Sequence, residues 1–335
     1  MSRKEVFFMK LHYNSIYSIY IKQFIDMKKA LGFKFETGSY MLSKIDRFAD
    51  LYGETLPGIT KEFADKWSKK QPNESAMYRY NRVMYLAMFS SYLCDLGIQS
   101  YIPRLLPFPK GTFVPYIYSK KEIDAIFKAC DMLSFSKQLY NSNLISMPVL
   151  LRLLYSTGIR ISEALALKNE DINLDDKYIR VTDCKNNKQR IIPISESLTA
   201  VCKEYVKYRD LLPLKNKRTE HFFIKLNGEK CGAGIHHWFR KCLKKAGIAY
   251  LGRKQGPRVH DLRHTFAVTS LANMADSGID MYASLPILSN YLGHQSINST
   301  NHYVRLTANM YPDLLKDVNL VCLDVFPKFK NYENN

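Results

Sequence analysis

The stretch that decides the fold of this chain opens with Gly256-Pro-Arg-Val-His260-Asp-Leu-Arg263-His264-Thr-Phe-Ala and closes with Tyr291-Leu-Gly-His294-Gln-Ser-Ile-Asn-Ser-Thr-Asn-His-Tyr303-Val-Arg. The phenol of Tyr303 is a poor nucleophile at neutral pH, because its ordinary pKa is about 10. Histidine moves protons near pH 7, and arginine grips an oxyanion with a planar fork of donors. Together these residue types suit the attack of a tyrosine oxygen on a phosphodiester.

The composition points to a nucleic-acid partner. Lys and Arg number 49 against 31 Asp and Glu in 335 residues, a net charge of +18. So much positive charge implies an anionic polymer or surface as the partner. Basic residues are interleaved with aromatics along the whole chain and are not gathered in a tail, which favours nucleic acid over a membrane surface.

Other bulk features exclude several classes of protein. No run of about 18 apolar residues is present that could span a bilayer, and no apolar signal segment follows the N-terminus. We therefore expect a cytoplasmic protein without a membrane partner. The seven cysteines are odd in number and form no CxxC pair, which argues for reduced thiols and against a disulfide framework or a zinc module.

Patterning predicts a helical first domain over residues 1–105, a linker over 106–117 and a second domain over 118–335. In the first domain, helices are expected from Ile16 to a stop at Gly32, over 40–51, from a cap at Thr60 to Trp67, and from a cap at Asn73 onward. The linker region is extended and semi-rigid because four prolines punctuate it: Pro103, Pro107, Pro109 and Pro115.

The second domain mixes helices with short strands. Ser119 and Glu122 have the spacing of a capping box, and a helix over 144–155 is predicted to stop at Gly158. The β-branched runs 178–182 and 189–194 predict a hairpin, and 222–226 predicts a third short strand. The expected fold is mainly α with a small antiparallel β-sheet in the second domain.

Strand transfer at phosphorus sets requirements that named residues can meet. Charge that gathers on the nonbridging oxygens calls for two guanidiniums, and Arg160 and Arg263 are the candidates. Lys185 on the hairpin turn can protonate the departing 5′ oxygen. His260 can assist deprotonation of Tyr303 or hydrogen-bond the phosphate, and His294 can donate to the same phosphate. Tyr303 would hold the DNA as a covalent ester.

With these residues in view, the chain resembles the tyrosine recombinase (phage integrase) family over both domains. The blocks that carry the resemblance are Ser156-Thr-Gly-Ile-Arg160-Ile-Ser-Glu163, Lys185-Asn-Asn-Lys-Gln-Arg-Ile-Ile-Pro, His260-Asp-Leu-Arg263-His-Thr-Phe-Ala, and Leu292-Gly-His294 before Tyr303. The resemblance carries catalytic roles onto Arg160, Lys185, His260, Arg263, His294 and Tyr303, and a supporting role onto Glu163.

The resemblance also implies an architecture and an activity. It implies a C-shaped two-domain DNA clamp, with a SAM-like helical domain that binds core DNA and a catalytic domain whose C-terminal helix docks on a neighbouring subunit. It implies a site-specific recombinase of a mobile element that cleaves and rejoins DNA through a 3′-phosphotyrosyl intermediate, without metal, ATP or other cofactor. The partners would be double-stranded recombination sites and a homotetramer on synapsed DNA, monomeric or dimeric when free.

Other interpretations remain open at this point. A type IB topoisomerase shares the chemistry, and a DNA-binding accessory protein would share the fold without turnover. His260, His264 and His294 have partial metal-ligand spacing, but Arg263 between them favours an anion over a cation. His264, His302, Tyr282 and Tyr291 are interpreted as structural, and the C-terminal helix can equally pack on its own domain.

The remaining candidates are cations that suit contacts with phosphates, although each also fits an ordinary solvated surface. These predicted DNA-binding residues are Lys66, Lys69, Arg79, Arg82, Arg104, Lys110, Lys188, Arg190 and Arg258.

Overall fold

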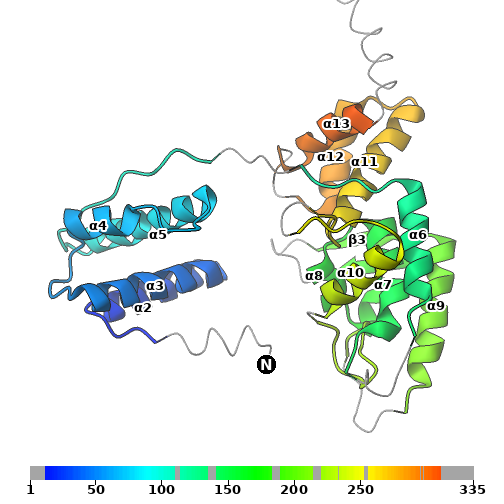
Figure 1. Cartoon of the computed structure of the whole chain (residues 1–335), viewed down its shortest axis with the longest axis horizontal. Coiled ribbons are helices and arrows are strands. Elements are labelled where there is room, and N and C mark those ends of the chain that lie inside the picture. Colours follow the sequence, from blue (N-terminus) through cyan, green and yellow to red (C-terminus); the bar gives the residue numbers. More distant parts are fainter. Residues whose placement is uncertain are drawn as a thin grey trace, which may run out of the picture. The chain divides into compact units, whose positions relative to one another are not determined.

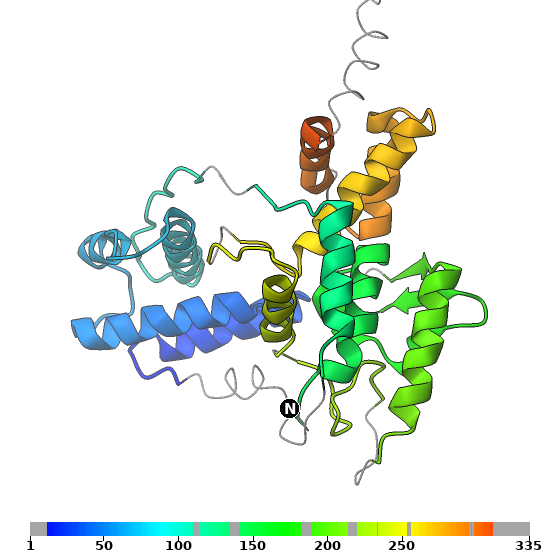
Figure 2. The ribbon, with the colours of Figure 1, turned by 45° about the vertical axis from the view of Figure 1, so that its right-hand side comes forward.

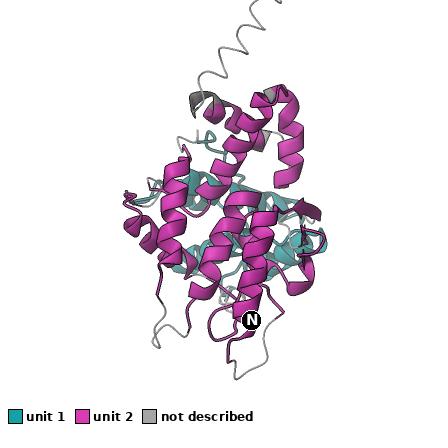
Figure 3. Ribbon diagram, turned by 90° about the vertical axis from the view of Figure 1, so that its right-hand side faces the viewer, with its two compact units in different colours: residues 1–112 teal, residues 113–335 magenta. Residues whose placement is uncertain are grey.

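The computed structural model describes residues 12–109, 114–134, 141–182, 189–213, 220–232, 234–252, 256–294, 296 and 298–310. The chain divides into two compact units, residues 1–112 and 113–335 (Figure 3). The division falls inside the linker predicted over 106–117. Each unit has its own apolar core, so the two are described separately.

The described part of unit 1 contains four helices around an aromatic core. Its helices are α2 (Ser18–Ala30), α3 (Glu36–Tyr52), α4 (Lys61–Ser68) and α5 (Ala76–Asp95) (Figure 1). Helix α3 ends at Gly53, whose left-handed φ of 76° suits glycine. Thr60 caps α4 as predicted, by accepting a hydrogen bond from the Phe63 amide. The cap of α5 is Ser75 and not Asn73, because Asn73 lies in a left-handed turn (φ 57°) before the helix.

Arg82 corrects one prediction about the DNA-binding surface. Its side chain is 2% exposed and forms an ion pair of 2.8 Å with Glu74, itself 3% exposed. The guanidinium also donates to the carbonyl oxygens of Trp67 and Lys69 and lies over the Trp67 ring. Arg82 therefore joins α4 to α5 inside the domain and cannot present its charge to DNA.

Unit 2 is mixed, with helices around a small sheet. Its elements in chain order are α6 (Lys120–Asp131), η2 (Leu144–Ser146), α7 (Met147–Thr157), α8 (Ile161–Ala166), η3 (Asn169–Asp171), β1 (Ile172–Asn173), β2 (Tyr178–Val181), β3 (Arg190–Pro193), α9 (Glu196–Asp210), α10 (Ile235–Lys245), α11 (Asp261–Asp276), α12 (Met281–Leu292) and α13 (Asn298–Met310). The predicted capping box at Ser119 and Glu122 opens α6.

The sheet is antiparallel, with the order β1-β2-β3. Strands β2 and β3 form the predicted hairpin, with Ile179 opposite Ile192 and Val181 opposite Arg190. The third strand is β1, which pairs with β2. Residues 222–226 were predicted as a strand, but Ile224 makes only an isolated bridge with Lys230, and the preceding His221 makes one with Lys168. The fold class is confirmed as mainly helical with a small antiparallel sheet.

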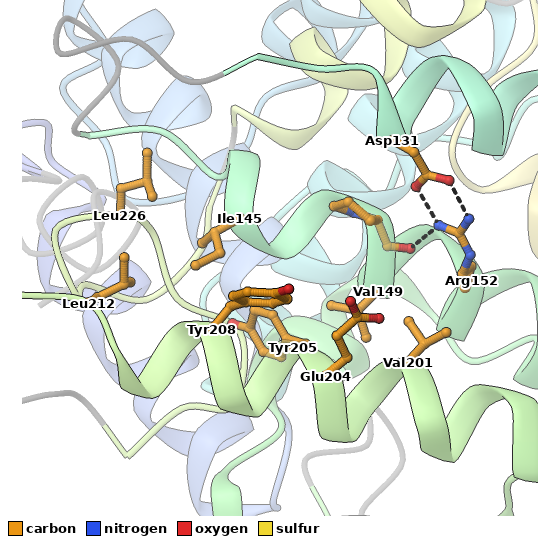
Figure 4. A pocket seen from close by; sticks show the side chains of 11 residues that line it. Asp131, Ile145, Val149, Arg152, Val201, Glu204, Tyr205, Tyr208, Leu212 and Leu226 are labelled. Atoms are coloured by element: carbon orange, nitrogen blue, oxygen red, sulfur yellow. Dashed lines mark hydrogen bonds and ion pairs between the residues drawn. The ribbon is translucent and has the colours of Figure 1, made fainter.

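The buried helix α7 organises the unit, since it packs against α6, α9 and α11. Helices α11, α12 and α13 pack on one another in turn and gather at one end of the unit (Figures 1 and 2). A separate, mostly apolar cavity of about 700 Å³ lies between α7 and α9, with the Arg152–Asp131 ion pair at one end (Figure 4). Among the described residues, no helix combines the length and apolar character needed to cross a bilayer.

Candidate active site

Two arginines from distant parts of the chain meet at the C-terminal end of α12. The Arg263 guanidinium donates to the Leu292 carbonyl oxygen (2.9 Å), and Arg160 donates to the next carbonyl oxygen, that of Gly293 (3.2 Å). These carbonyls lack partners within the helix and carry its negative dipole end, so they are natural acceptors for guanidinium groups. The structure therefore brings Arg160 and Arg263 together at this shared anchor.

Two glycines make this approach sterically feasible. Gly158 ends α7 with φ 60°, and its carbonyl oxygen accepts from Arg263 at 2.8 Å. Gly293 ends α12 with φ 66°, and a Cβ there would lie 2.9 Å from Nη1 of Arg190. Gly293 thus lets the end of α12 come close to Arg190, whereas Gly158 leaves room for the Phe266 ring, which would lie 2.3 Å from an added Cβ.

Glu163 is the carboxylate that holds Arg160 in place. Its Oε1 accepts from Arg160 Nη1 at 2.8 Å, and its Oε2 accepts from the Arg160 amide at 3.0 Å. The same Oε2 forms an ion pair of 2.7 Å with Arg190 Nη2 at the start of β3. The Arg190 side chain is 11% exposed, so its prediction as a DNA contact is corrected: it ties the hairpin to Glu163.

The nucleophile candidate Tyr303 is buried among imidazoles. Its side chain on α13 is 1% exposed, and its hydroxyl lies 2.8 Å from Nδ1 of His264 on α11. The ring of His302 lies 4.0 Å from the Tyr303 ring between centroids, and the His294 ring stacks parallel to it at 6.3 Å.

The other two predicted histidines also belong to this cluster. His294 follows the α12 cap, where its Nε2 lies 2.8 Å from Arg263 Nη2 and its Nδ1 lies 2.7 Å from Thr300 Oγ1. His260 precedes α11, one turn before His264, and meets the His264 ring edge-on at 4.9 Å. The geometry thus gathers Arg160, Arg263, His260, His294 and Tyr303, as predicted, around the end of α12.

Burial leaves the imidazoles of the site uncharged at neutral pH. Burial first, and then nearby cations, lower the pKa of His260 and of His294 to about 4. Burial, with His260 and His302 close by, lowers the pKa of His264 to about 3. Burial raises the pKa of Tyr303, although Arg263 opposes that shift. The phenol is therefore protonated and the histidines are neutral in the free protein.

The guanidiniums, in contrast, carry charge that nearby acids do not balance. Arg160, Arg190 and Arg263 supply three positive charges, and Glu163 supplies one negative charge among them. Burial and the neighbouring Arg160 lower the pKa of Arg263 to about 10, so the group is still charged at neutral pH. A cluster of this kind attracts an anion with oxygens that accept hydrogen bonds, such as a phosphodiester.

Comparison with known proteins agrees with this geometry. Residues 117–310 match the phage integrase family. The chain is 30% identical over 300 residues to y4rB of Sinorhizobium fredii, which is named as an integrase/recombinase. The match covers 89% of this chain and 94% of that one. It is also 30% identical over 251 residues to the tyrosine recombinase XerD of Chlamydia trachomatis, covering 73% and 75%. The chain belongs to the phage integrase family.

Structure comparison agrees on the fold of this integrase-family protein. A lambda integrase fragment, solved as a dimer bound to a core site, is similar with a TM-score of 0.60 at 18% identity, over 85% of this chain and 93% of that one. Family membership makes the protein a tyrosine site-specific recombinase, an enzyme of DNA strand breakage and rejoining.

Sequence reasoning missed one functional neighbour in this integrase-family site. His264 was interpreted as structural, yet its imidazole is the one that contacts the Tyr303 hydroxyl. Its spacing of four residues from His260 placed both rings on one helix face, which was the available signal. Which of the two meets the tyrosine depends on how α13 packs on α11, and helical spacing does not reveal that.

The remaining predicted residues fall into three groups. Lys185, Lys188 and Lys110 lie outside the described residues. Lys66, Lys69 and Arg104 are exposed and Arg79 is half-buried, so they stay candidates for phosphate contacts. Arg258 is half-buried and forms an ion pair of 2.7 Å with Asp261, which orders the start of α11.

Proposed function

We propose that this recombinase cleaves one DNA strand by attack of the Tyr303 hydroxyl oxygen on the scissile phosphorus. The step would leave a 3′-phosphotyrosyl ester and a free 5′ hydroxyl, and reversal on a partner strand would reseal the DNA. The observation that carries this assignment is the meeting of two charged guanidiniums at the end of α12, where the His294 ring that contacts Arg263 also stacks on Tyr303. Because the ester conserves bond energy, the cycle needs no ATP.

Each residue has a role that follows from its contacts. Arg160 and Arg263 would hold the nonbridging oxygens, because their anchoring bonds to α12 leave further N–H donors on each guanidinium. His260 would donate a hydrogen bond to the same phosphate from a neutral ring. His294 would do so from Nε2 after the phosphate replaces its contact with Arg263, because Nε2 accepts from Arg263 in the free protein. Lys185, predicted on the hairpin turn, would protonate the leaving 5′ oxygen.

Glu163 and Arg190 would act through other residues. Glu163 orients Arg160 with two hydrogen bonds, and Arg190 holds Glu163 from the opposite side. Since Arg190 begins β3, the same ion pair would also fix the start of that strand. Both are positioning residues, and neither needs to contact the DNA.

The assembly we propose is a homotetramer on two synapsed recombination sites, formed from monomers or dimers in the cytoplasm. The two units would close around the duplex as a C-shaped clamp. The reaction would integrate, excise or resolve a mobile element. The net charge of +18 supports a DNA partner for the whole chain.

The test is capture of the covalent intermediate. Nicked duplexes that tile the DNA flanking the coding region would serve as suicide substrates, since loss of a short fragment beside the nick prevents resealing. Wild-type protein should give an adduct that survives denaturing electrophoresis. Tyr303→Phe should bind the same duplexes and give no adduct, because it lacks the one oxygen that attacks.

The control is Tyr291→Phe, which removes the hydroxyl of another tyrosine, one whose ring stacks on Phe266. This variant should form adduct at nearly the wild-type rate. An adduct that persists in Tyr303→Phe would assign the nucleophile to another residue, and a wild-type protein without any adduct would contradict the proposed function itself.

A further inference from the structure

The Tyr303 hydroxyl lies within hydrogen-bond distance of an imidazole. Nδ1 of His264 is 2.8 Å from the hydroxyl oxygen of Tyr303. A neutral imidazole has one nitrogen with a hydrogen and one with a free lone pair. In the tautomer with its hydrogen on Nε2, the Nδ1 lone pair of His264 accepts the phenolic hydrogen bond, and this is the form that can take up a proton from Tyr303.

His260 is placed differently, although the two histidines share one face of the helix. Its ring meets the His264 ring edge-on, with 4.9 Å between centroids, whereas the His264 ring lies 5.7 Å from the Tyr303 ring. The cations and imidazoles that face His264 are Arg258, His260 and Arg263 from around the start of α11, and His302 from α13. Among these groups, His264 is the imidazole in hydrogen-bond contact with the atom that reacts.

We propose that His264 is a catalytic residue that takes the proton of the nucleophile, a step that rests on the proposed function above. As Tyr303 Oη forms its bond to phosphorus, the phenolic proton moves to His264 Nδ1. The bond from phosphorus to the 5′ oxygen breaks, its electron pair stays on that oxygen, and the general acid protonates it. Resealing returns each proton by the reverse path, so no oxidant, reductant or metal is required.

The same geometry keeps the free protein unreactive. An imidazolium at His264 is disfavoured without DNA, because burial and neighbouring positive groups oppose its charge. A phosphodiester held by Arg160 and Arg263 brings negative charge close to this ring and favours the protonated form. His264 thus becomes an effective base when the substrate phosphate is in place, and the phenol stays protonated otherwise.

Two substitutions separate proton transfer from positioning. His264→Asn keeps a side-chain oxygen near the position of Nδ1, so it can accept the phenolic hydrogen bond but cannot take up the proton. We expect it to bind the nicked duplex like wild type and to form adduct about 10²- to 10⁴-fold more slowly. His302→Asn is the matched control, since it removes another imidazole beside the same ring, and its rate should stay within about tenfold of wild type.

Rescue by a more acidic phenol completes the test. A fluorinated tyrosine at position 303 loses its proton more readily, so it should restore adduct formation in His264→Asn by at least about tenfold. It should give little gain in His260→Asn, where the phosphate contact is the missing part. Circular dichroism would check that each variant is folded.

The outcomes separate the two proposals. Wild-type adduct together with a His264→Asn rate equal to wild type would overturn the role of His264 and leave the proposed function intact. A slow His264→Asn variant that the fluorinated tyrosine does not rescue would reduce His264 to a positioning residue, which also overturns the proposal. Absence of adduct in the wild type would instead count against the proposed function.

Discussion

Arg82 in unit 1 and Arg263 in unit 2 are both almost fully buried, at 1% and 3% exposure, but their partners differ in charge. Arg82 pairs with the buried carboxylate of Glu74. Arg263 is bound by two carbonyl oxygens and a neutral imidazole. The first arginine is neutralised by its partner, while the second keeps a full positive charge in a poorly solvated place.

This difference explains why one arginine is structural and the other can be catalytic. A buried charge without a counter-ion is unfavourable, and the lowered pKa of Arg263, about 10, reflects that cost. An incoming phosphate supplies the missing negative charge, so the charge of Arg263 and the charge of the phosphate stabilise each other when the substrate binds. Arg263 therefore differs from Arg82 in having several hydrogen-bond partners that are all uncharged.

The largest effect is expected for Arg263→Ala. This variant should bind DNA, since most of the phosphate contacts remain, but should form the covalent adduct at least about 10³-fold more slowly because charge developing on the phosphate loses a guanidinium. Adduct formation on nicked duplexes at saturating protein concentration measures this. A variant that retains the wild-type rate would remove Arg263 from the catalytic site.

Arg82→Ala should have the opposite profile. Removal of Arg82 leaves Glu74 buried without its counter-ion, which should lower the free energy of unfolding by about 3–5 kcal/mol. The protein that remains folded should form adduct at the wild-type rate. Thermal unfolding and adduct formation at low temperature give the two measurements.

Arg79→Ala is the matched control for that variant. Arg79 lies on the same helix, half-buried, and donates one hydrogen bond to the Ser68 carbonyl oxygen, so its loss should cost about 1 kcal/mol. If Arg82→Ala unfolded like wild type and lost DNA affinity instead, the original interpretation of Arg82 as a phosphate contact would be restored.

The contrast between these arginines also shows what the sequence could and could not predict. Local signals located the stop at Gly158 and the capping box at Ser119, because helix ends depend on residues close in sequence. The hairpin of β2 and β3 followed from its β-branched runs. In the same way, the motif spacing was sufficient to choose both arginines of the site.

The errors about individual side chains involve contacts between segments distant along the chain or across a turn. Glu74 reaches Arg82 across the turn that precedes α5, so the burial of Arg82 could not be inferred from its helix alone. Arg190 was assigned to the outside of the hairpin because its partner Glu163 lies on another element. The contact between His264 and the Tyr303 hydroxyl depends on the packing of α13 on α11, which could not be inferred from the sequence.

Glu163→Gln is expected to lower the free energy of unfolding by less than Arg82→Ala does, and this loss should depend on pH. Burial alone would raise the pKa of Glu163, but hydrogen bonds from Arg190 and Arg160 outweigh burial and hold the pKa below its ordinary 4.5. Because the folded state favours the carboxylate, this group stabilises the protein at pH values above about 4.5, and the stabilisation is lost as the pH falls through the lower folded value. At pH 7 the glutamine should reduce the free energy of unfolding by about 1.5–3 kcal/mol, the range for hydrogen bonds to charged groups.

The difference in the free energy of unfolding between wild type and Glu163→Gln should narrow below pH 4.5, where the wild-type carboxylate also takes up a proton. Denaturant unfolding of the full chain at pH 7 and in acid would measure it. A difference that stays constant over that range would mean that Glu163 acts by its shape and not by its charge, and that Arg160 needs no carboxylate to hold its position.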